Sequence, residues 1–243
     1  MNLVGKKILV TGAGSGIGRA VAIGYARAGA AVACLSRNHE NLLQTIGLME
    51  NASGRGLALP ADICDFELLE KQVLAAEHDM GGLDLVFAAA GEALENKPVE
   101  SSDVQAFRRT VEVNLSGAFN TAKATIPALR RSGGGHMIFV GSGTGHRAAA
   151  TRAAYASSKA GLNMLVRVLA QELIEEGIAV NELVPGPVLT AFIAGRAEQL
   201  QAAAGGHEWF KTPEDVVPMA LFLALQPQPG PTGQTFSLAR REL

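Results

Sequence analysis

Tyr155 and Lys159 have the residue types and the spacing of a proton-transfer pair. They stand four positions apart at the start of a segment with helical periodicity, so the two side chains share one helix face. A nearby ammonium group favours the phenolate, and it should lower the pKa of Tyr155 below the ordinary tyrosine value of about 10. Such a tyrosine exchanges a proton with a carbonyl or an alcohol near neutral pH. Taken alone, the pair also fits an ordinary contact on a helix surface.

The glycine-rich stretch Thr11-Gly-Ala-Gly-Ser-Gly-Ile-Gly18 is a candidate phosphate site. It follows the apolar run Lys7 to Val10, and a helical pattern continues from Ile17 to Ala28. A backbone without Cβ atoms lets a ligand approach closely, and the N–H groups at a helix start attract a phosphate. A tight structural turn would explain the glycines equally well. The strand before, the helix after and a second strand at Ala31 to Ser36 complete a βαβ unit, which favours a dinucleotide site.

Further polar residues stand where predicted strands end. They are Ser36 with Arg37, Asp62, Ser142 and the loop Pro185–Thr190. Ligands of an open parallel sheet bind outside the carboxyl ends of its strands. We therefore expect these residues to lie around one ligand site.

The order of the predicted elements supplies the scaffold for that site. Strands are predicted at Lys7–Val10, Ala31–Ser36, Leu57–Pro60, Leu83–Gly91, His136–Val140, Ile178–Val184 and Gln234–Leu238. Helices are predicted at Ile17–Ala28, from a cap at Asn38 to about Met49, at Phe66–His78, from a cap at Ser102 to Arg131, at Tyr155–Glu176 and at Thr212–Leu225, with a turn at Ser53–Gly56. Alternating strands and helices indicate a parallel sheet covered on both faces. We predict an α/β fold: a Rossmann-type doubly wound parallel sheet of about seven strands, in one domain over residues 1–243.

Composition narrows the class of protein. The 243 residues are 48% hydrophobic with a net charge of −2, so they can bury a large core and show no basic nucleic-acid footprint. No apolar run is long enough to span a bilayer, and no leader pattern precedes the first strand. Cys34 and Cys64 are unclustered, and His146 and His207 lack metal-ligand spacing. We expect a soluble cytoplasmic protein without a metal site.

Several of these motifs, taken in register, resemble the short-chain dehydrogenase/reductase family over essentially the whole chain. The resemblance is carried by Thr11–Gly18, Asp62, Asn114 in Val-Asn-Leu-Ser-Gly117, Ser142, Tyr155-Ala-Ser-Ser-Lys159, and Pro185-Gly186 with Thr190. Local explanations exist for single residues, such as a helix cap for Asp62 or a surface role for Ser142. The joint order of the motifs favours the family.

The resemblance implies a role for each catalytic residue. Tyr155 would protonate the substrate oxygen during reduction, or take the alcohol proton during oxidation. Lys159 would bind the nicotinamide ribose and lower the pKa of Tyr155. Ser142 would hold the substrate carbonyl, and Asn114 would interrupt its helix and hold a water that relays protons through Lys159.

The resemblance also implies a nicotinamide dinucleotide as cofactor. Asp62 and the Ile63 backbone would contact the adenine ring, and Val188 and Thr190 would fix the carboxamide. The implied cofactor-binding residues are Gly12, Gly14, Ser15, Gly16, Ile17, Gly18, Ser36, Arg37, Asp62, Ile63, Gly91, Tyr155, Lys159, Pro185, Gly186, Val188 and Thr190.

The second strand favours NADP(H) over NAD(H). NAD sites usually place a carboxylate at the end of this strand for the ribose 2′-hydroxyl, whereas this chain has Ser36 and Arg37 and no acid before Glu40. An arginine there can pair with a 2′-phosphate. The alternatives are an exposed loop arginine and the use of NAD(H).

Two segments depart from the family pattern. The family usually has Asn-Asn-Ala-Gly after its fourth strand, and this chain has Ala88-Ala-Ala-Gly91, so hydrogen bonds that brace the sheet must come from elsewhere. At the other end, Phe236–Leu243 replaces the common Asp-Gly-Gly ending.

The insertion at residues 190–211 is the predicted substrate lid. Phe192, Ile193, Trp209 and Phe210 give it apolar side chains, which suits a ketone or alcohol with an apolar portion. Arg147 and Arg152 precede Tyr155 and would meet an acidic substrate or an acyl-carrier partner, or else stand in a solvated loop.

Among broad relatives, the chain resembles 3-oxoacyl-acyl-carrier-protein reductases most closely. The resemblance also implies a homodimer or homotetramer through the two long helices. The sequence leaves a non-catalytic dinucleotide sensor as the alternative to a carbonyl reductase. The substrate and the physiological direction stay open.

Overall fold

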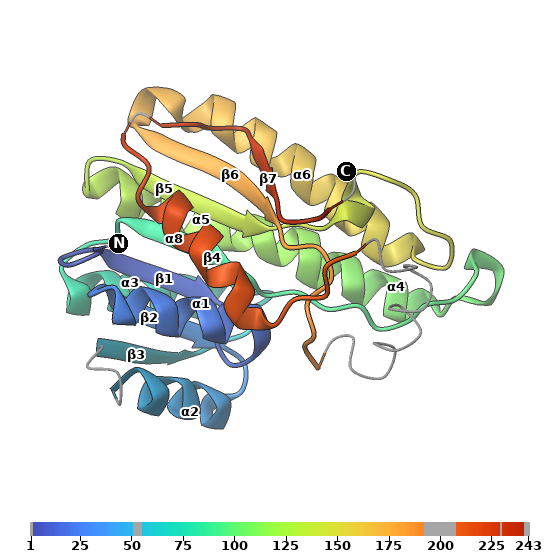
Figure 1. Cartoon of the computed structure of the whole chain (residues 1–243), viewed down its shortest axis with the longest axis horizontal. Coiled ribbons are helices and arrows are strands. Elements are labelled where there is room, and N and C mark those ends of the chain that lie inside the picture. Colours follow the sequence, from blue (N-terminus) through green and yellow to red (C-terminus); the bar gives the residue numbers. More distant parts are fainter. Residues whose placement is uncertain (1, 51–54, 192–207, 229, 241–243) are drawn as a thin grey trace.

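Seven parallel strands form one sheet through the middle of the molecule (Figure 1). The strands are β1 (Lys7–Thr11), β2 (Ala31–Ser36), β3 (Arg55–Pro60), β4 (Leu85–Ala88), β5 (Gly135–Val140), β6 (Ile178–Val184) and β7 (Thr235–Ser237). Their order is β3-β2-β1-β4-β5-β6-β7, and every neighbouring pair is parallel. The computed structural model describes residues 2–50, 55–191, 208–228 and 230–240. The predicted α/β Rossmann-type sheet is confirmed.

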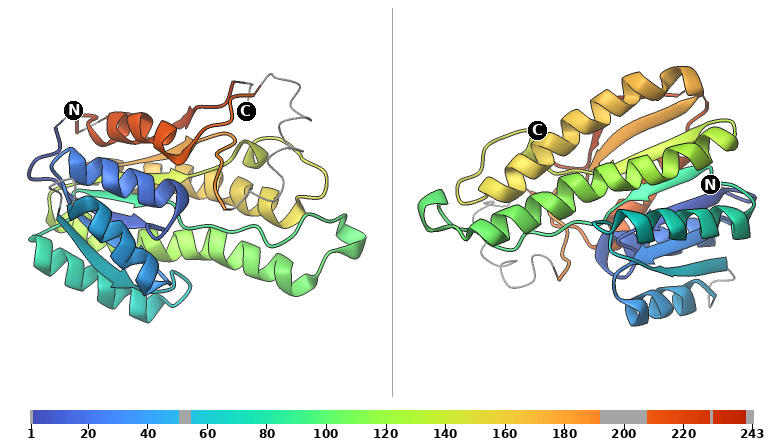
Figure 2. Two further views of the ribbon diagram at one scale, coloured as in Figure 1. Left: turned by 60° about the horizontal axis from the view of Figure 1, so that its bottom comes forward. Right: turned by 180° about the vertical axis from the view of Figure 1, so that it is seen from behind.

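Helices cover both faces of this sheet (Figure 2). The α-helices are α1 (Gly16–Arg27), α2 (His39–Glu50), α3 (Phe66–Met80), α4 (Val104–Val111), α5 (Gly117–Arg131), α6 (Ala153–Leu173) and α8 (Val217–Ala224). Shorter helical segments are η1 (Val99–Ser101), the π-helix η2 (Glu112–Ser116), η3 (Gly143–Gly145), η4 (Ile174–Glu176) and η6 (Pro213–Val216).

The hydrophobic core has one layer on each face of the sheet. Successive residues of β1 show the alternation, since Leu9 packs with α3, α5 and α6, whereas Ile8 and Val10 pack with α1, α2 and α8. Central strands buried on both faces explain the nearly continuous apolar runs of the sequence.

Of the two helix caps predicted at Asn38 and Ser102, the structure has the first and not the second. Asn38 caps α2 as predicted, because its Oδ1 accepts a hydrogen bond from the Asn41 N–H at 2.9 Å. The cap predicted at Ser102 is wrong. Asp103 caps α4 instead, accepting hydrogen bonds from the N–H groups of Gln105 and Ala106 at 2.7 and 2.8 Å, while the Ser102 hydroxyl donates to Glu95.

Two strand boundaries also differ from expectation. The turn predicted at Ser53–Gly56 is wrong at its end, because β3 already begins at Arg55, and residues 51–54 lie outside the described part. The strand predicted at Leu83–Gly91 pairs only over Leu85–Ala88. The following residues, 89–91, line a pocket instead. In the described ranges, no helix is both long and apolar enough to cross a membrane.

Candidate active site

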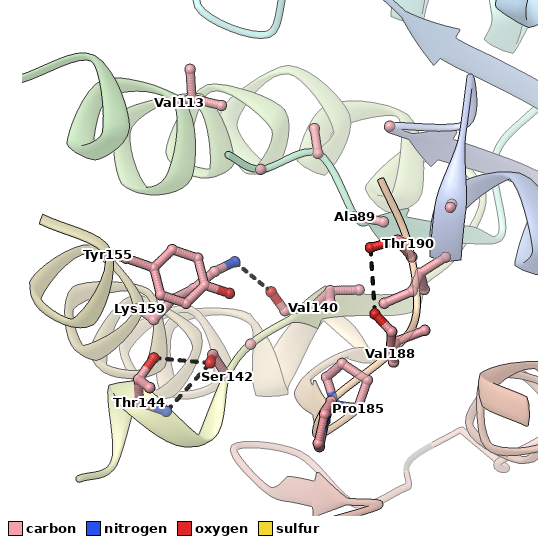
Figure 3. Close-up of a pocket in the computed structure, with 18 of the residues that line it drawn as sticks. Ala89, Val113, Val140, Ser142, Thr144, Tyr155, Lys159, Pro185, Val188 and Thr190 are labelled. Carbon is pink, nitrogen blue, oxygen red and sulfur yellow. Dashed lines mark hydrogen bonds between the residues drawn. The ribbon is translucent and has the colours of Figure 1, made fainter. Parts of the chain in front are cut away.

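A pocket of about 780 Å³ opens at the carboxyl ends of the central strands (Figure 3). This volume lies within the range usual for small-molecule and cofactor sites. The pocket is lined by most of the predicted site residues, namely Gly12, Ser15, Gly16, Ile17, Gly18, Ser36, Arg37, Asp62, Ile63, Gly91, Ser142, Tyr155, Lys159, Pro185, Gly186, Val188 and Thr190. Two predicted residues, Gly14 and Asn114, do not line it.

Ser142, Tyr155 and Lys159 meet at one end of the pocket. Tyr155 and Lys159 come from the first two turns of α6, and the Lys159 Nζ lies 5.9 Å from the centroid of the Tyr155 ring. The Lys159 ammonium donates a hydrogen bond to the Val140 carbonyl at 2.8 Å. Ser142 follows β5, and its hydroxyl lies 3.0 Å from the Thr144 hydroxyl and hydrogen-bonds Tyr155. The three side chains therefore converge on a space for one small polar group.

Burial is the largest influence on the pKa values of Tyr155 and Lys159. It raises the pKa of Tyr155, and the hydrogen bond with Ser142 and the charge of Arg152 only partly oppose it. The Arg152 guanidinium carbon lies 4.8 Å from the Tyr155 ring centroid. Burial lowers the pKa of Lys159 to about 8, against the opposing charge of Glu182. The sequence predicts a lowered pKa for Tyr155, and the structure contradicts this because the cost of ionising a buried phenol outweighs the nearby charges.

Asn114 lies behind the pocket, in the π-helix η2 that separates α4 from α5. Its amide holds the β4–α4 connection, accepting from the Glu92 N–H and donating to the Glu92 carbonyl, both at 2.8 Å, and it donates to Ser158 at 3.0 Å. The predicted interruption of the long helix is confirmed. π-bulges of this kind often mark functional sites.

The glycine-rich loop forms the opposite end of the pocket. Ser15 precedes α1 without capping it through its side chain, so the first-turn N–H groups stay available to an anion. A Cβ on Gly12 would stand 2.8 Å from the Ala90 nitrogen, so only glycine allows this close approach to the end of β4. Gly14 instead packs against Ser36 and Asn41, which explains its absence from the lining.

Thr11 holds the residues that follow β4. Its carbonyl accepts a hydrogen bond from the Ala89 N–H at 3.2 Å, and its hydroxyl accepts one from the Ala90 N–H at 3.4 Å. The strand end that carries Gly91 is thereby held beside the pocket.

An ionic network surrounds the end of β2 and β3. The Asp62 carboxylate accepts from the Cys64 N–H at 3.0 Å and from Arg109 at 2.9 Å. Burial raises the pKa of Asp62, but these two donors outweigh it and the net pKa is lowered. Arg37 stands 3.5 Å from Glu92 and 4.0 Å from Asp62, with 59% of its side chain exposed. Contacts this exposed are weak, so Arg37 is able to turn toward a ligand in the pocket.

The predicted lid lies mostly outside the described residues, including Phe192, Ile193 and His207. Of the other two apolar lid residues, Phe210 lines the pocket, whereas the Trp209 ring faces the Lys211 ammonium at 4.2 Å and does not line it. The strand-like pairing of Val188 with Lys211 holds the start and end of this insertion together.

Sequence reasoning missed several lining residues on the substrate side. Asn96, Thr144, Thr151 and Glu208 line the pocket there, beside Arg147 and Arg152. Thr151 has a φ of 66°, the left-handed value that is uncommon for residues other than glycine, and nothing in the sequence marks this conformation. Asn96 and Glu208 carry no local signal, because only the tertiary fold brings them here.

These features fit a dinucleotide. The pocket joins a helix N-terminus at one end to a buried ammonium and two hydroxyls at the other, with Asp62 and Arg37 beside the loop. The uncapped first turn of α1 suits a pyrophosphate. In the described part of the chain no group of three or more His, Cys, Asp or Glu side chains is arranged to hold a metal.

Comparison with known proteins identifies the family of this chain. Residues 6–201 match the short chain dehydrogenase family. A short-chain dehydrogenase/reductase of Armillaria gallica is 34% identical, over 96% of this chain and 94% of that protein. A short-chain type dehydrogenase/reductase of Mycobacterium ulcerans superposes with a TM-score of 0.93 at 29% identity, covering 98% of this chain and 90% of that one. A candidate NAD(P)-dependent gluconate 5-dehydrogenase of Beutenbergia cavernae, solved with NADP bound at low occupancy, has a TM-score of 0.88 at 33% identity, covering 98% of this chain and 97% of that one.

Proposed function

The chain belongs to the short-chain dehydrogenase/reductase family, and we propose that it interconverts a ketone and a secondary alcohol with NADP(H), using Tyr155 as the proton donor and acceptor. Membership makes it an NAD(P)-dependent oxidoreductase acting on small molecules. The observation that carries the proposal is the convergence of Ser142, Tyr155 and Lys159 at one end of a dinucleotide-sized pocket.

The three side chains divide the work at the substrate oxygen. The Tyr155 hydroxyl gives its proton to that oxygen during reduction, and burial keeps the proton on the phenol until then. The Ser142 hydroxyl, already hydrogen-bonded to Tyr155, holds the same oxygen in place. The buried Lys159 ammonium would hold the nicotinamide ribose and would stabilise the phenolate that forms. A bound nicotinamide supplies or accepts the hydride.

NADP(H) is the proposed cofactor, with NAD(H) as the alternative. Ser36 and Arg37 follow β2 at the pocket rim, where an arginine pairs well with a phosphate. Both cofactors occur among solved relatives, NADP at low occupancy in the Beutenbergia cavernae protein and NAD⁺ in a xylitol dehydrogenase, so the choice of NADP(H) rests on Arg37. Glu92 and Asp62, the two acids beside Arg37, must release it for the phosphate to bind.

The substrate proposed is a carbonyl or alcohol with an apolar portion, because Phe210 and the alanines of residues 148–150 line the substrate side. Arg147 and Arg152 also line it and favour a substrate that bears an acidic group, of which a 3-oxoacyl thioester on an acidic carrier is one case. We further propose that the chain acts as one domain, as a cytoplasmic homotetramer or homodimer.

A cofactor-oxidation panel tests the proposal. The purified chain is given NADPH or NADH with ketones that vary in apolar length and in acidic groups, including a 3-oxoacyl thioester. We expect turnover with NADPH on ketones that have an apolar portion. Binding of NADPH without turnover on any ketone, or on the matching alcohols with NADP⁺, would contradict the proposal and favour a cofactor sensor.

A further inference from the structure

Glu182 is a buried carboxylate in the middle of β6, and it does not line the pocket. Its side chain has 0% exposure. One oxygen, Oε2, accepts hydrogen bonds from Asn163 Nδ2 and from the Thr235 hydroxyl, both at 2.8 Å, and lies 2.8 Å from His146 Nε2. Burying a carboxylate is costly unless it is paired and hydrogen-bonded. A buried acid in a central strand therefore needs an explanation beyond packing.

Thr235 belongs to the neighbouring strand β7, but the other two partners of Glu182, His146 and Asn163, belong to the segments that carry the catalytic residues. His146 directly follows η3, the short helix that begins after Ser142. Asn163 stands one turn after Lys159 on α6. The same elements also touch each other, because a Cβ on Gly145 would stand 2.8 Å from the Lys159 carbonyl carbon. Glu182 thus joins the Ser142 loop to the helix that holds Lys159.

The other oxygen of Glu182 lies against the backbone that leads into Ser142. A Cβ on Gly141 would stand 1.8 Å from Glu182 Oε1, so the carboxylate occupies the space that a side chain at 141 would need. The Lys159 ammonium hydrogen-bonds the neighbouring Val140 carbonyl at 2.8 Å. Glu182 and Lys159 therefore lie against adjacent residues, Gly141 and Val140. The Glu182 charge also opposes the fall in the pKa of Lys159 that burial causes.

We propose that Glu182 is a positioning residue for the proposed reaction: its carboxylate holds the Ser142 loop through His146, and it lies next to the peptide group that Lys159 binds, where it acts electrostatically on the Lys159 ammonium. The charged and titratable groups that face this pair are Tyr155 on α6, Arg152 just before α6, and His146 after η3. The inference rests on the proposed function, yet the charge on Lys159 can be measured without cofactor or substrate.

The first test is an NMR titration of the free enzyme labelled with 13C at the lysine Cε. The Lys159 resonance, identified by its loss in Lys159→Met, should titrate near pH 8 in the wild type. In Glu182→Gln the midpoint should fall by about one pH unit or more, the usual effect of removing an opposite charge. Glu172→Gln is the matched control, because Glu172 is exposed on α6, the helix that carries Lys159. It should leave the midpoint of the Lys159 titration unchanged. An unchanged midpoint in Glu182→Gln would overturn the inference.

The second test separates charge from position. Glu182→Asp keeps the charge but shortens the reach to His146, so kcat should fall at least about tenfold while the Lys159 midpoint and the KM for NADPH stay near wild type. In Glu182→Gln the alkaline limb of the reduction profile should also move to lower pH. Wild-type kcat in the folded aspartate variant would contradict the positioning role, even if Glu182→Gln fails to fold. Absence of turnover in the wild type would instead contradict the proposed function and leave the titration result standing.

Discussion

Tyr155 stands close to two cations, with Lys159 Nζ at 5.9 Å and the Arg152 guanidinium carbon at 4.8 Å from its ring centroid. Both favour the phenolate, yet burial still raises the pKa of Tyr155. The residue is therefore held as a protonated phenol at neutral pH, the form that a proton donor to a carbonyl needs. The protonated phenol is the form that the proposed reduction uses, and the reverse oxidation would need the phenolate.

Lys159 should make folding stability depend on pH. Its folded pKa of about 8 lies below the unfolded value of 10.5, so between these values the unfolded chain binds the extra proton and stability rises with pH. The free energy of unfolding of wild type relative to Lys159→Met should therefore increase by roughly 3 kcal/mol from pH 7 to above pH 10. Urea unfolding of both proteins across this range measures it. A difference that stays constant with pH would contradict the lowered pKa.

Arg37 should decide between the two cofactors. In Arg37→Ala the KM for NADPH should rise about 10- to 100-fold, the loss expected for one charge-assisted hydrogen bond, while the KM for NADH changes little. Initial rates with both cofactors give the comparison, with Arg27→Ala on α1 as a control for a lost surface charge. Equal effects on both cofactors would rule out a phosphate contact.

Two short helices support the site: η3 begins directly after Ser142, and the π-helix η2 carries Asn114, which holds the β4–α4 connection behind the pocket. The Val-Asn-Leu-Ser-Gly motif predicts an interruption at Asn114, and the structure shows it as a π-helix rather than a break. The cap at Ser102 could not be predicted correctly, because Ser102 and Asp103 are both good caps and the competing contact of Ser102 with Glu95 decides between them.

Gly145→Ala tests whether η3 must lie tightly on α6. The added methyl would stand 2.8 Å from the Lys159 backbone, so η3 must shift and take Ser142 away from Tyr155. We expect kcat to fall at least about tenfold with NADPH affinity nearly unchanged, since small misplacements of catalytic groups are costly. Gly47→Ala in α2 is the control, because its methyl meets no atom within 4 Å and should leave kcat unchanged. Wild-type kcat in Gly145→Ala would show that the contact does not matter.

At the scale of the whole molecule, the alternation of strands and helices was enough to predict the parallel sheet and its two helical layers. It did not predict the ion pair of Asp62 with Arg109 or the contact of Glu182 with His146, which join residues 47 and 36 positions apart. Such contacts have no period and no local motif. For the contact of Glu182, the sequence offers one hint, namely an acidic residue inside the largely apolar strand Ile178–Val184.

We expect subunits of this protein to associate through the outer surface of α4, α5 and α6. Helices α5 and α6 lie side by side on one face of the molecule (Figure 2). Phe107, Phe119, Met164 and Val168 leave large apolar side chains exposed on these helices. Exposed apolar side chains on neighbouring helices favour an interface where they form one patch. Sedimentation equilibrium at micromolar concentration should give a homotetramer or homodimer, and Phe119→Lys should weaken it. A monomeric wild type would contradict the expectation.

Tyr155→Phe tests whether Tyr155 donates the proton to the substrate oxygen. The change removes one hydroxyl and keeps the ring beside Arg152, so the fold and NADPH binding should survive. Turnover on the best ketone of the panel should fall by about 10²- to 10⁴-fold, the usual contribution of a positioned general acid. NADPH titration by fluorescence, run on the same preparation, shows that the site is intact. A Tyr155→Phe enzyme that binds NADPH and keeps near-normal turnover would contradict the account.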